Sequence, residues 1–150
     1  MSWNYQIDKE RRLVITTAWA EIDGDQVLEH QRRLRSDRDF NPDFYQLLDF
    51  TRVTKVNIDL PTVMELSDLD LFSGKSRRAF FAGSNLLAYG MCRMFIAFRK
   101  ASGEEELKVF QDRDEALQWL FYESEWARAH AESGLALDGK SLPIGKSCVL

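Results

Sequence analysis

The chain has 150 residues, of which 45% are hydrophobic and 29% are charged. That length and balance predict one soluble folded domain and exclude a disordered or membrane-spanning chain. Twenty basic and 24 acidic side chains give a net charge of −4, which argues against general nucleic-acid binding because such binding needs a basic face.

The amino-terminal part predicts a β-hairpin and then a helix. Residues 5–7 and 13–17 are typical of two strands, and residues 8–11 form a plausible turn between them. Asp23, followed three residues later by Gln26, has the form of a capping box and predicts the start of the first helix.

The central stretch, residues 44–53, is a short and mostly apolar run. Such a run is typical of a strand buried on both faces of a parallel sheet. Residues 54–58 are then expected to form a connector. Asp59 as the cap and Pro61 in the first turn predict a second helix, which should end near residues 73–75.

A second buried strand is predicted over residues 78–82, followed by a tight turn and a helix cap at residues 83–85. The third helix carries an apolar stripe at helical spacing, made of Leu87, Met91, Met94, Phe95 and Phe98. Gly90 on the same face predicts a close backbone approach. We interpret the stripe as core packing, and a methionine-lined ligand cavity is the alternative.

A third parallel strand is predicted over residues 107–111. Asp112 and Glu115 form another capping box, from which a long helix should run to about residue 132. A single domain would then cover residues 1–132, with a tail over residues 133–150. The pattern predicts an α/β fold: a mixed, mostly parallel sheet with an amino-terminal hairpin and helices packed on it.

The last helix carries two apolar faces. Leu117, Leu120 and Phe121 should face the sheet, whereas Trp119, Tyr122 and Trp126 gather on the opposite side. We expect these three aromatics to form an interface with a protein partner, most simply a second copy of the chain. The alternative is that the chain's own tail covers them.

Polar side chains follow two neighbouring predicted strands where each strand ends. Asp49, Thr51 and Arg52 end the central strand, and Ser84 and Asn85 follow the next one. Because the carboxyl ends of parallel strands meet at one edge, these groups are expected to share a surface that binds a ligand or partner. A strand-end ion pair or a helix cap is the alternative interpretation.

Chemistry-bearing motifs are few. Residues 134–141 match a phosphate-binding loop formally, but no buried strand precedes them, so we treat the match as chance and expect no nucleotide binding. His30 and His130 lie far apart in sequence, and Cys92 lies within an apolar helix. We therefore expect no enzyme, no metal and no cofactor.

Four segments together resemble the STAS superfamily, and in particular its bacterial stand-alone SpoIIAA-like proteins. The segments are Leu47–Thr51, Tyr89–Phe95, Val109–Asp112 and Glu115–Leu120. The resemblance implies a STAS-like α/β fold and a regulatory module that works through protein contacts. The resemblance extends to lipid-carrying Sec14-type domains, with which such proteins are sometimes grouped.

The chain departs from the phosphorylated STAS antagonists at one turn. Their acceptor serine belongs to an Asp-Ser-Ser-Gly turn at the start of the second helix, and residues 57–60 stand there without a hydroxyl group. We therefore expect no phosphorylation switch. Asp59 provides either a permanent carboxylate near the place of the phosphate or simply a helix cap.

These observations predict a non-enzymatic, cytoplasmic binding module. The residues at the amino terminus lack the pattern of a secretion signal, and two cysteines are too few for a disulfide scaffold. A protein partner or homodimer is the first expectation. The alternative is a carrier or sensor of an apolar, lipid-like small molecule held between the sheet and the third helix.

Overall fold

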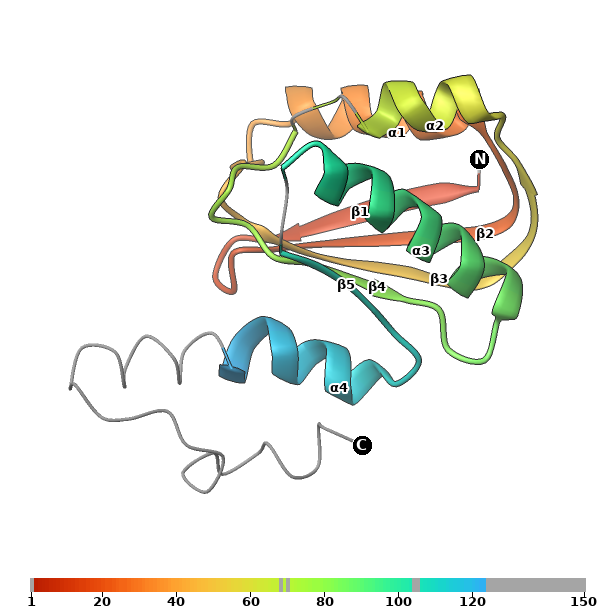
Figure 1. The fold of residues 1–150 in the computed structure, drawn as a ribbon. Helices are drawn as coiled ribbons and strands as arrows, with labels where there is room; N and C mark the ends of the chain where they lie inside the picture. The colour runs from red at the N-terminus through yellow and green to blue at the C-terminus, as the bar shows by residue number, and fades with distance from the viewer. Residues whose placement is uncertain (1, 68, 70, 104–105, 124–150) are drawn as a thin grey trace.

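The computed structural model describes residues 2–67, 69, 71–103 and 106–123 (Figure 1). The strands of the described part are β1 (Trp3–Asp8), β2 (Leu13–Asp23), β3 (Tyr45–Asn57), β4 (Arg78–Phe81) and β5 (Leu107–Phe110). The helices are α1 (Gly24–Ser36), α2 (Leu60–Ser67), α3 (Leu86–Ala101) and α4 (Arg113–Leu117), which continues as the π-helical segment η1 (Gln118–Glu123).

The strands form one sheet in the order β1-β2-β3-β4-β5. β1 and β2 pair antiparallel as a hairpin, and every other neighbouring pair is parallel. Helices α1, α2 and α3 cover one face of the sheet, and α4 covers the other (Figure 1). The predicted mixed, mostly parallel α/β sheet with an amino-terminal hairpin is confirmed. Among the described helices, none is both long enough and apolar enough to cross a membrane.

The core of the described part forms three clusters, of which the two largest lie on opposite faces of the sheet. The larger cluster lies beneath α1, α2 and α3 and includes Leu48, Phe80 and Ile96. Leu47 and Leu120 belong to the cluster on the opposite face, beneath α4 and η1. Neighbouring residues of β3 thus enter opposite cores, as the alternation of side chains along a strand requires.

β3 is the middle strand of the sheet and is longer than the sequence predicts. The connector expected at residues 54–58 is wrong, because the strand continues to Asn57, which pairs with Asp23 at the end of β2. The register shifts between Thr17 and Trp19 and again between Ala20 and Glu21. At each shift β3 contains one residue more than β2, as in a β-bulge. The strict alternation of side chains along β3 is interrupted there, so polar residues can follow one another, while the pairing with β2 continues.

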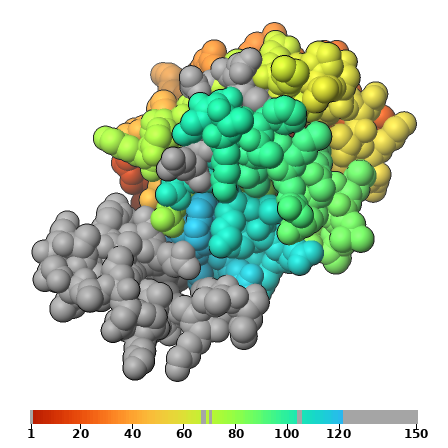
Figure 2. Space-filling model, in the orientation of Figure 1, coloured from red at the N-terminus to blue at the C-terminus, as the bar shows by residue number. Residues whose placement is uncertain are grey.

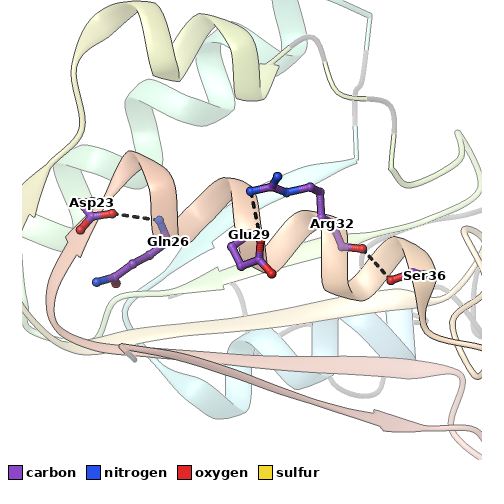
Figure 3. A network of polar contacts seen from close by, with 5 residues as sticks. All are labelled: Asp23, Gln26, Glu29, Arg32 and Ser36. Carbon is purple, nitrogen blue, oxygen red and sulfur yellow. Dashed lines mark hydrogen bonds and ion pairs between the residues drawn. The ribbon is translucent and has the colours of Figure 1, made fainter.

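Local hydrogen bonds fix the ends of α1, as Figure 3 shows. The backbone N–H of Gln26 donates to Asp23 Oδ1 at 2.9 Å, which confirms the predicted cap. Arg32 pairs with Glu29 at 3.0 Å, and Ser36 Oγ donates to the carbonyl oxygen of Arg32 at 3.0 Å. These contacts lie within the helix or at its cap, and Val27, His30 and Leu34 face the core.

Two helix predictions need correction. α2 ends at Ser67 rather than near residues 73–75. On α3 the buried face is made by Ala88, Cys92 and Ile96, whereas Leu87 is 48% exposed and Met94 is 43% exposed. The fully buried stripe is therefore shifted by one residue from the predicted one, whereas Met91 and Phe95 of the predicted stripe are partly buried and pack against the core.

The role predicted for Gly90 is also wrong. A Cβ atom added at Gly90 would meet nothing within 4 Å, so no other backbone approaches the helix there. The small residues that face the core are Ala88 and Cys92, and they permit the close packing of α3.

Candidate functional site

Asn85 links the turn after β4 to the part of β3 that extends beyond β4. It is the N-cap of α3, and its Oδ1 accepts from the backbone N–H of Ala88 at 3.1 Å. Its Nδ2 donates to the carbonyl oxygen of Val53 at 2.7 Å, with longer contacts to the carbonyls of Phe50 and Thr51. Both polar atoms of Asn85 therefore hold β3 against the start of α3.

Asp49, Thr51 and Arg52 lie within β3 rather than at its predicted end, because the strand continues to Asn57. Asp49 and Thr51 form a local pair on β3. The N–H and the hydroxyl group of Thr51 donate to Asp49 Oδ1 at 2.9 and 2.7 Å. Gly83 packs against this pair in a left-handed conformation with φ +59°, and an added Cβ would lie 3.0 Å from Thr51 Cγ2. The structure thus brings Asp49 and Thr51 together with the turn before α3.

The remaining predicted positions lie near the same edge or cap a helix. Arg52 is exposed, with its guanidinium 5.9 Å from the ring of Trp19, and Ser84 is exposed. Asp59 accepts from the backbone N–H of Thr62 at 3.0 Å, and hydrogen bonds with Thr62 lower the pKa of the Asp59 carboxyl. The helix-cap interpretation of Asp59 is confirmed. Ligand or partner binding by these residues stays a prediction.

Trp119 lies against the sheet rather than on the outer side of its helix. Its ring packs on Phe110 of β5 at 5.6 Å, and the guanidinium of Arg77 stands 4.8 Å from the same ring. A π-helix closes its hydrogen bonds one residue later than an α-helix, so the assumed 100° spacing fails here. Tyr122 belongs to η1, and Trp126 lies outside the described residues. The predicted aromatic interface stays a prediction.

A cavity of about 70 Å³ lies between the sheet and helices α1, α2 and α3. It is partly open to the surface, and Met94 in its lining is 43% exposed. Its wall is mostly apolar, with contributions from Leu48, Phe80, Val63, Leu66, Met91 and Phe95. The methionine-lined cavity, which the sequence offered as an alternative, is thus present in the structure.

A chain of buried polar side chains runs from strand to strand across the sheet, beneath this cavity. Arg78 Nε donates to Gln46 Oε1 at 3.1 Å, and Gln46 Nε2 donates to Thr16 Oγ1 at 2.9 Å. Thr16 Oγ1 lies 3.5 Å from His30 Nε2. β4, β3, β2 and α1 each supply one member, and His30 and Arg78 also line the cavity.

Aromatic rings surround the guanidinium of Arg78. Its central carbon lies 4.8 Å from the ring of Phe72, 5.6 Å from Phe80 and 5.7 Å from Phe95. The faces of these rings attract a cation, and the attraction is stronger away from water. Arg78 therefore places a guanidinium group, held among aromatic rings, in the wall of a mostly apolar cavity.

Burial changes two titratable groups in the cavity wall. Burial is the main cause that lowers the pKa of His30 from 6.5 to about 4, and the positive charges of Arg33 and Arg78 add to it. Burial also raises the pKa of the Cys92 thiol to about 12. At neutral pH the cavity thus holds a neutral imidazole and an un-ionised thiol. Among the described residues, no cluster of histidine, cysteine and acidic side chains is arranged to hold a metal ion.

Sequence reasoning missed Trp3, Gln46 and Arg78 as residues of this region. The available signal was a polar residue within an apolar strand, since Gln46 interrupts the central run and Arg78 opens the next one. These two residues are direct register partners of β3 and β4, and the sequence by itself does not fix that pairing.

Comparison with solved structures identifies the fold. An uncharacterised protein of the DUF3478 family from Shewanella loihica PV-4, described as having a SpoIIAA-like fold, superposes with a TM-score of 0.51 at 17% sequence identity. The match covers 79% of this chain and 94% of that one. The fold of this chain is SpoIIAA-like.

The resemblance predicted from the sequence is therefore confirmed at the level of the SpoIIAA-like fold. At such low identity the likeness shows the fold alone. No protein-family model and no curated protein matches the chain. The function must be argued from the site.

Proposed function

We propose that this protein is a non-enzymatic binding protein for a small apolar molecule, held in the cavity between the sheet and α3. The observation that carries the proposal is the mostly apolar, surface-connected cavity of about 70 Å³. Ligand sites are concave and mainly apolar, with a few polar groups that orient the ligand. A single water needs only roughly 10–15 Å³ by a comparable measure, and packed cores leave few larger voids.

The side chains near the opening suit such a ligand. Met91 and Met94 of α3 line the cavity, and an unbranched thioether side chain adapts its shape at little cost. Met94 is partly exposed, so it can move aside without opening the core. The cavity can therefore enlarge around a molecule bigger than its empty volume.

Methionine methyl groups provide a direct test. The chain has four methionines, of which Met91 and Met94 line the cavity and Met64 is an exposed residue of α2 outside the lining. We expect toluene, titrated into protein with ¹³C-labelled methionine methyl groups, to shift the NMR signals of Met91 and Met94 in a saturable way. The Met64 signal should stay unchanged. Absence of saturable shifts at Met91 and Met94 contradicts the proposal.

Two variants of α2 serve as a matched pair for this test. Val63 lines the cavity and is 6% exposed, so Val63→Phe should fill it and abolish toluene binding. Met64→Phe introduces the same ring one residue away on the exposed side, and it should leave toluene affinity unchanged. Equal affinities in the two variants would place the binding site elsewhere.

A protein-interaction module is the second candidate function, and exposed apolar side chains favour it. Leu60 and Met64 of α2 are 55% and 52% exposed, and Leu86 and Leu87 of α3 are 77% and 48% exposed. The two helices are in contact, and both reach the face of the molecule that Figure 2 shows. Exposed apolar side chains offer contacts to a protein partner when they lie together in one patch.

Native mass spectrometry of freshly purified protein distinguishes the two candidates. A co-purified small molecule adds mass to the chain and supports the binding protein. A bare dimer supports the interaction module, and Leu87→Lys should then convert it to a monomer. A bare monomer of the wild-type chain counts against both candidates.

A further inference from the structure

Two buried polar atoms of the cavity wall have no hydrogen-bond partner within the described part of the chain. They are Trp3 Nε1 and Gln31 Oε1, and both residues line the cavity. A third such atom, Gln26 Oε1, belongs to a residue outside the lining. Two of the three unpartnered atoms thus belong to residues of this one cavity.

The two atoms belong to residues that flank His30. The ring of Trp3 on β1 stacks on the His30 ring with centroids 5.2 Å apart, and Gln31 follows His30 in α1. Trp3 is 8% exposed, and its edge-on contact with Phe50 holds the indole ring in place. The cavity wall therefore carries one unpartnered donor from β1 and one unpartnered acceptor from α1.

A buried polar group without a partner destabilises a protein, so native structures satisfy nearly all such groups. The indole N–H acts only as a hydrogen-bond donor, and the amide oxygen acts only as an acceptor. A molecule that satisfies both must accept at one point and donate at another. A hydroxyl group does this with a single oxygen atom, whereas a carboxylate has no hydrogen to donate and an ammonium group has no lone pair to accept.

We infer that the cavity is built for an apolar molecule with one hydroxyl group, an alcohol or a phenol, whose oxygen accepts from Trp3 Nε1 and whose hydrogen is donated to Gln31 Oε1. This inference rests on the proposed function and adds the chemical class of the ligand. The apolar part of the molecule occupies the space toward Met91 and Met94.

Phenol and toluene form a matched pair of probes, since a hydroxyl group in one replaces a methyl group in the other. We expect phenol to bind about tenfold more tightly than toluene in the methionine-methyl titration, because two hydrogen bonds in a dry cavity replace none. Benzoate is the third probe, because the buried guanidinium of Arg78 offers a carboxylate an alternative partner. We expect benzoate to bind more weakly than phenol, because a carboxylate has no hydrogen to donate to Gln31 Oε1.

Trp3→Phe removes the indole N–H and keeps a ring against His30, and Gln31→Met removes the acceptor and keeps the length of the side chain. Each change should lower the preference for phenol about threefold, with toluene affinity nearly unchanged. Trp19→Phe is the control, since Trp19 lies outside the cavity lining and should keep the full preference. Gln31→Met still decides the matter if Trp3→Phe does not fold.

Each outcome has a separate meaning. Loss of the phenol preference in the two cavity variants, with the preference intact in Trp19→Phe, supports the inference. Equal affinities of the wild-type protein for phenol and toluene overturn it and leave the proposed function standing. Tighter binding of benzoate than of phenol, or an unchanged preference in both cavity variants, also overturns it. Binding of none of the three probes overturns the proposed function as well.

Discussion

Acidification should destabilise this protein through His30, which lines the candidate cavity. In the folded chain the pKa of His30 lies at about 4, chiefly because burial disfavours the charged imidazolium, whereas its ordinary value is 6.5. The unfolded chain therefore takes up a proton near pH 6.5 that the folded chain takes up only near pH 4. The stability that the neutral imidazole contributes is complete above the unfolded pKa of 6.5, and it is lost as the pH falls from there toward the folded pKa of about 4.

The magnitude follows from the two pKa values. Their difference corresponds to about 3 kcal/mol over the whole window. Between about pH 7 and about pH 5 the same linkage gives a loss of about 2 kcal/mol in the free energy of unfolding. Because urea acts with a slope of about 1–3 kcal/mol per molar, the unfolding midpoint should fall by about 1 M.

The assay is urea unfolding at the two pH values, followed by tryptophan fluorescence and circular dichroism. His30→Phe keeps a ring beside Trp3 and Tyr5 and removes the titrating group. On acidification its free energy of unfolding should therefore fall by about 2 kcal/mol less than that of the wild-type chain. His30→Gln serves the same purpose if the phenylalanine is too large. Carboxylates titrate in both proteins and cancel in the comparison. Equal losses in the wild-type chain and both variants would refute the reasoning.

Four further predictions concern the strand edge and the carboxyl-terminal part. Asn85→Ala should lower the free energy of unfolding by about 2–3 kcal/mol in urea unfolding, and Asn85→Ser, which restores the cap alone, should recover about 1 kcal/mol of it; equal losses would exclude the cap. Gly83→Ala should lower the free energy of unfolding by about 1–2 kcal/mol in the same assay, because Gly83 has φ +59° and the new Cβ would press on Thr51. An unchanged urea midpoint would contradict this. If Trp126 forms a dimer interface, light scattering should show a wild-type dimer and a folded Trp126→Glu monomer, whereas a wild-type monomer with Trp126 shielded from quenchers points to coverage by the tail. Calorimetric titration with ATP and GTP plus Mg²⁺ should show no saturable binding, and binding abolished by Lys140→Ala would reverse that expectation.

The sequence by itself determined the order of elements and the places where helices begin. Asp23, Asp59 and Asn85 each accept a hydrogen bond from a backbone N–H three residues later, as their positions predicted. Such bonds depend only on residues that are neighbours in the chain, so a local pattern identifies them. The strand and helix periods, together with the STAS resemblance, were likewise enough for the SpoIIAA-like fold.

The tertiary structure decided what the local patterns left open. β3 extends to Asn57 because β2 pairs with it along that length, and Trp119 turns to the sheet because the last helix changes to π geometry. The candidate cavity depends on such long-range choices most of all. Its wall and floor combine residues from β1, β2, β3, β4 and three helices, and the Gln46–Arg78 pair exists only through the register of two strands. Register and packing depend on residues distant in the sequence, so no local pattern could place these side chains together.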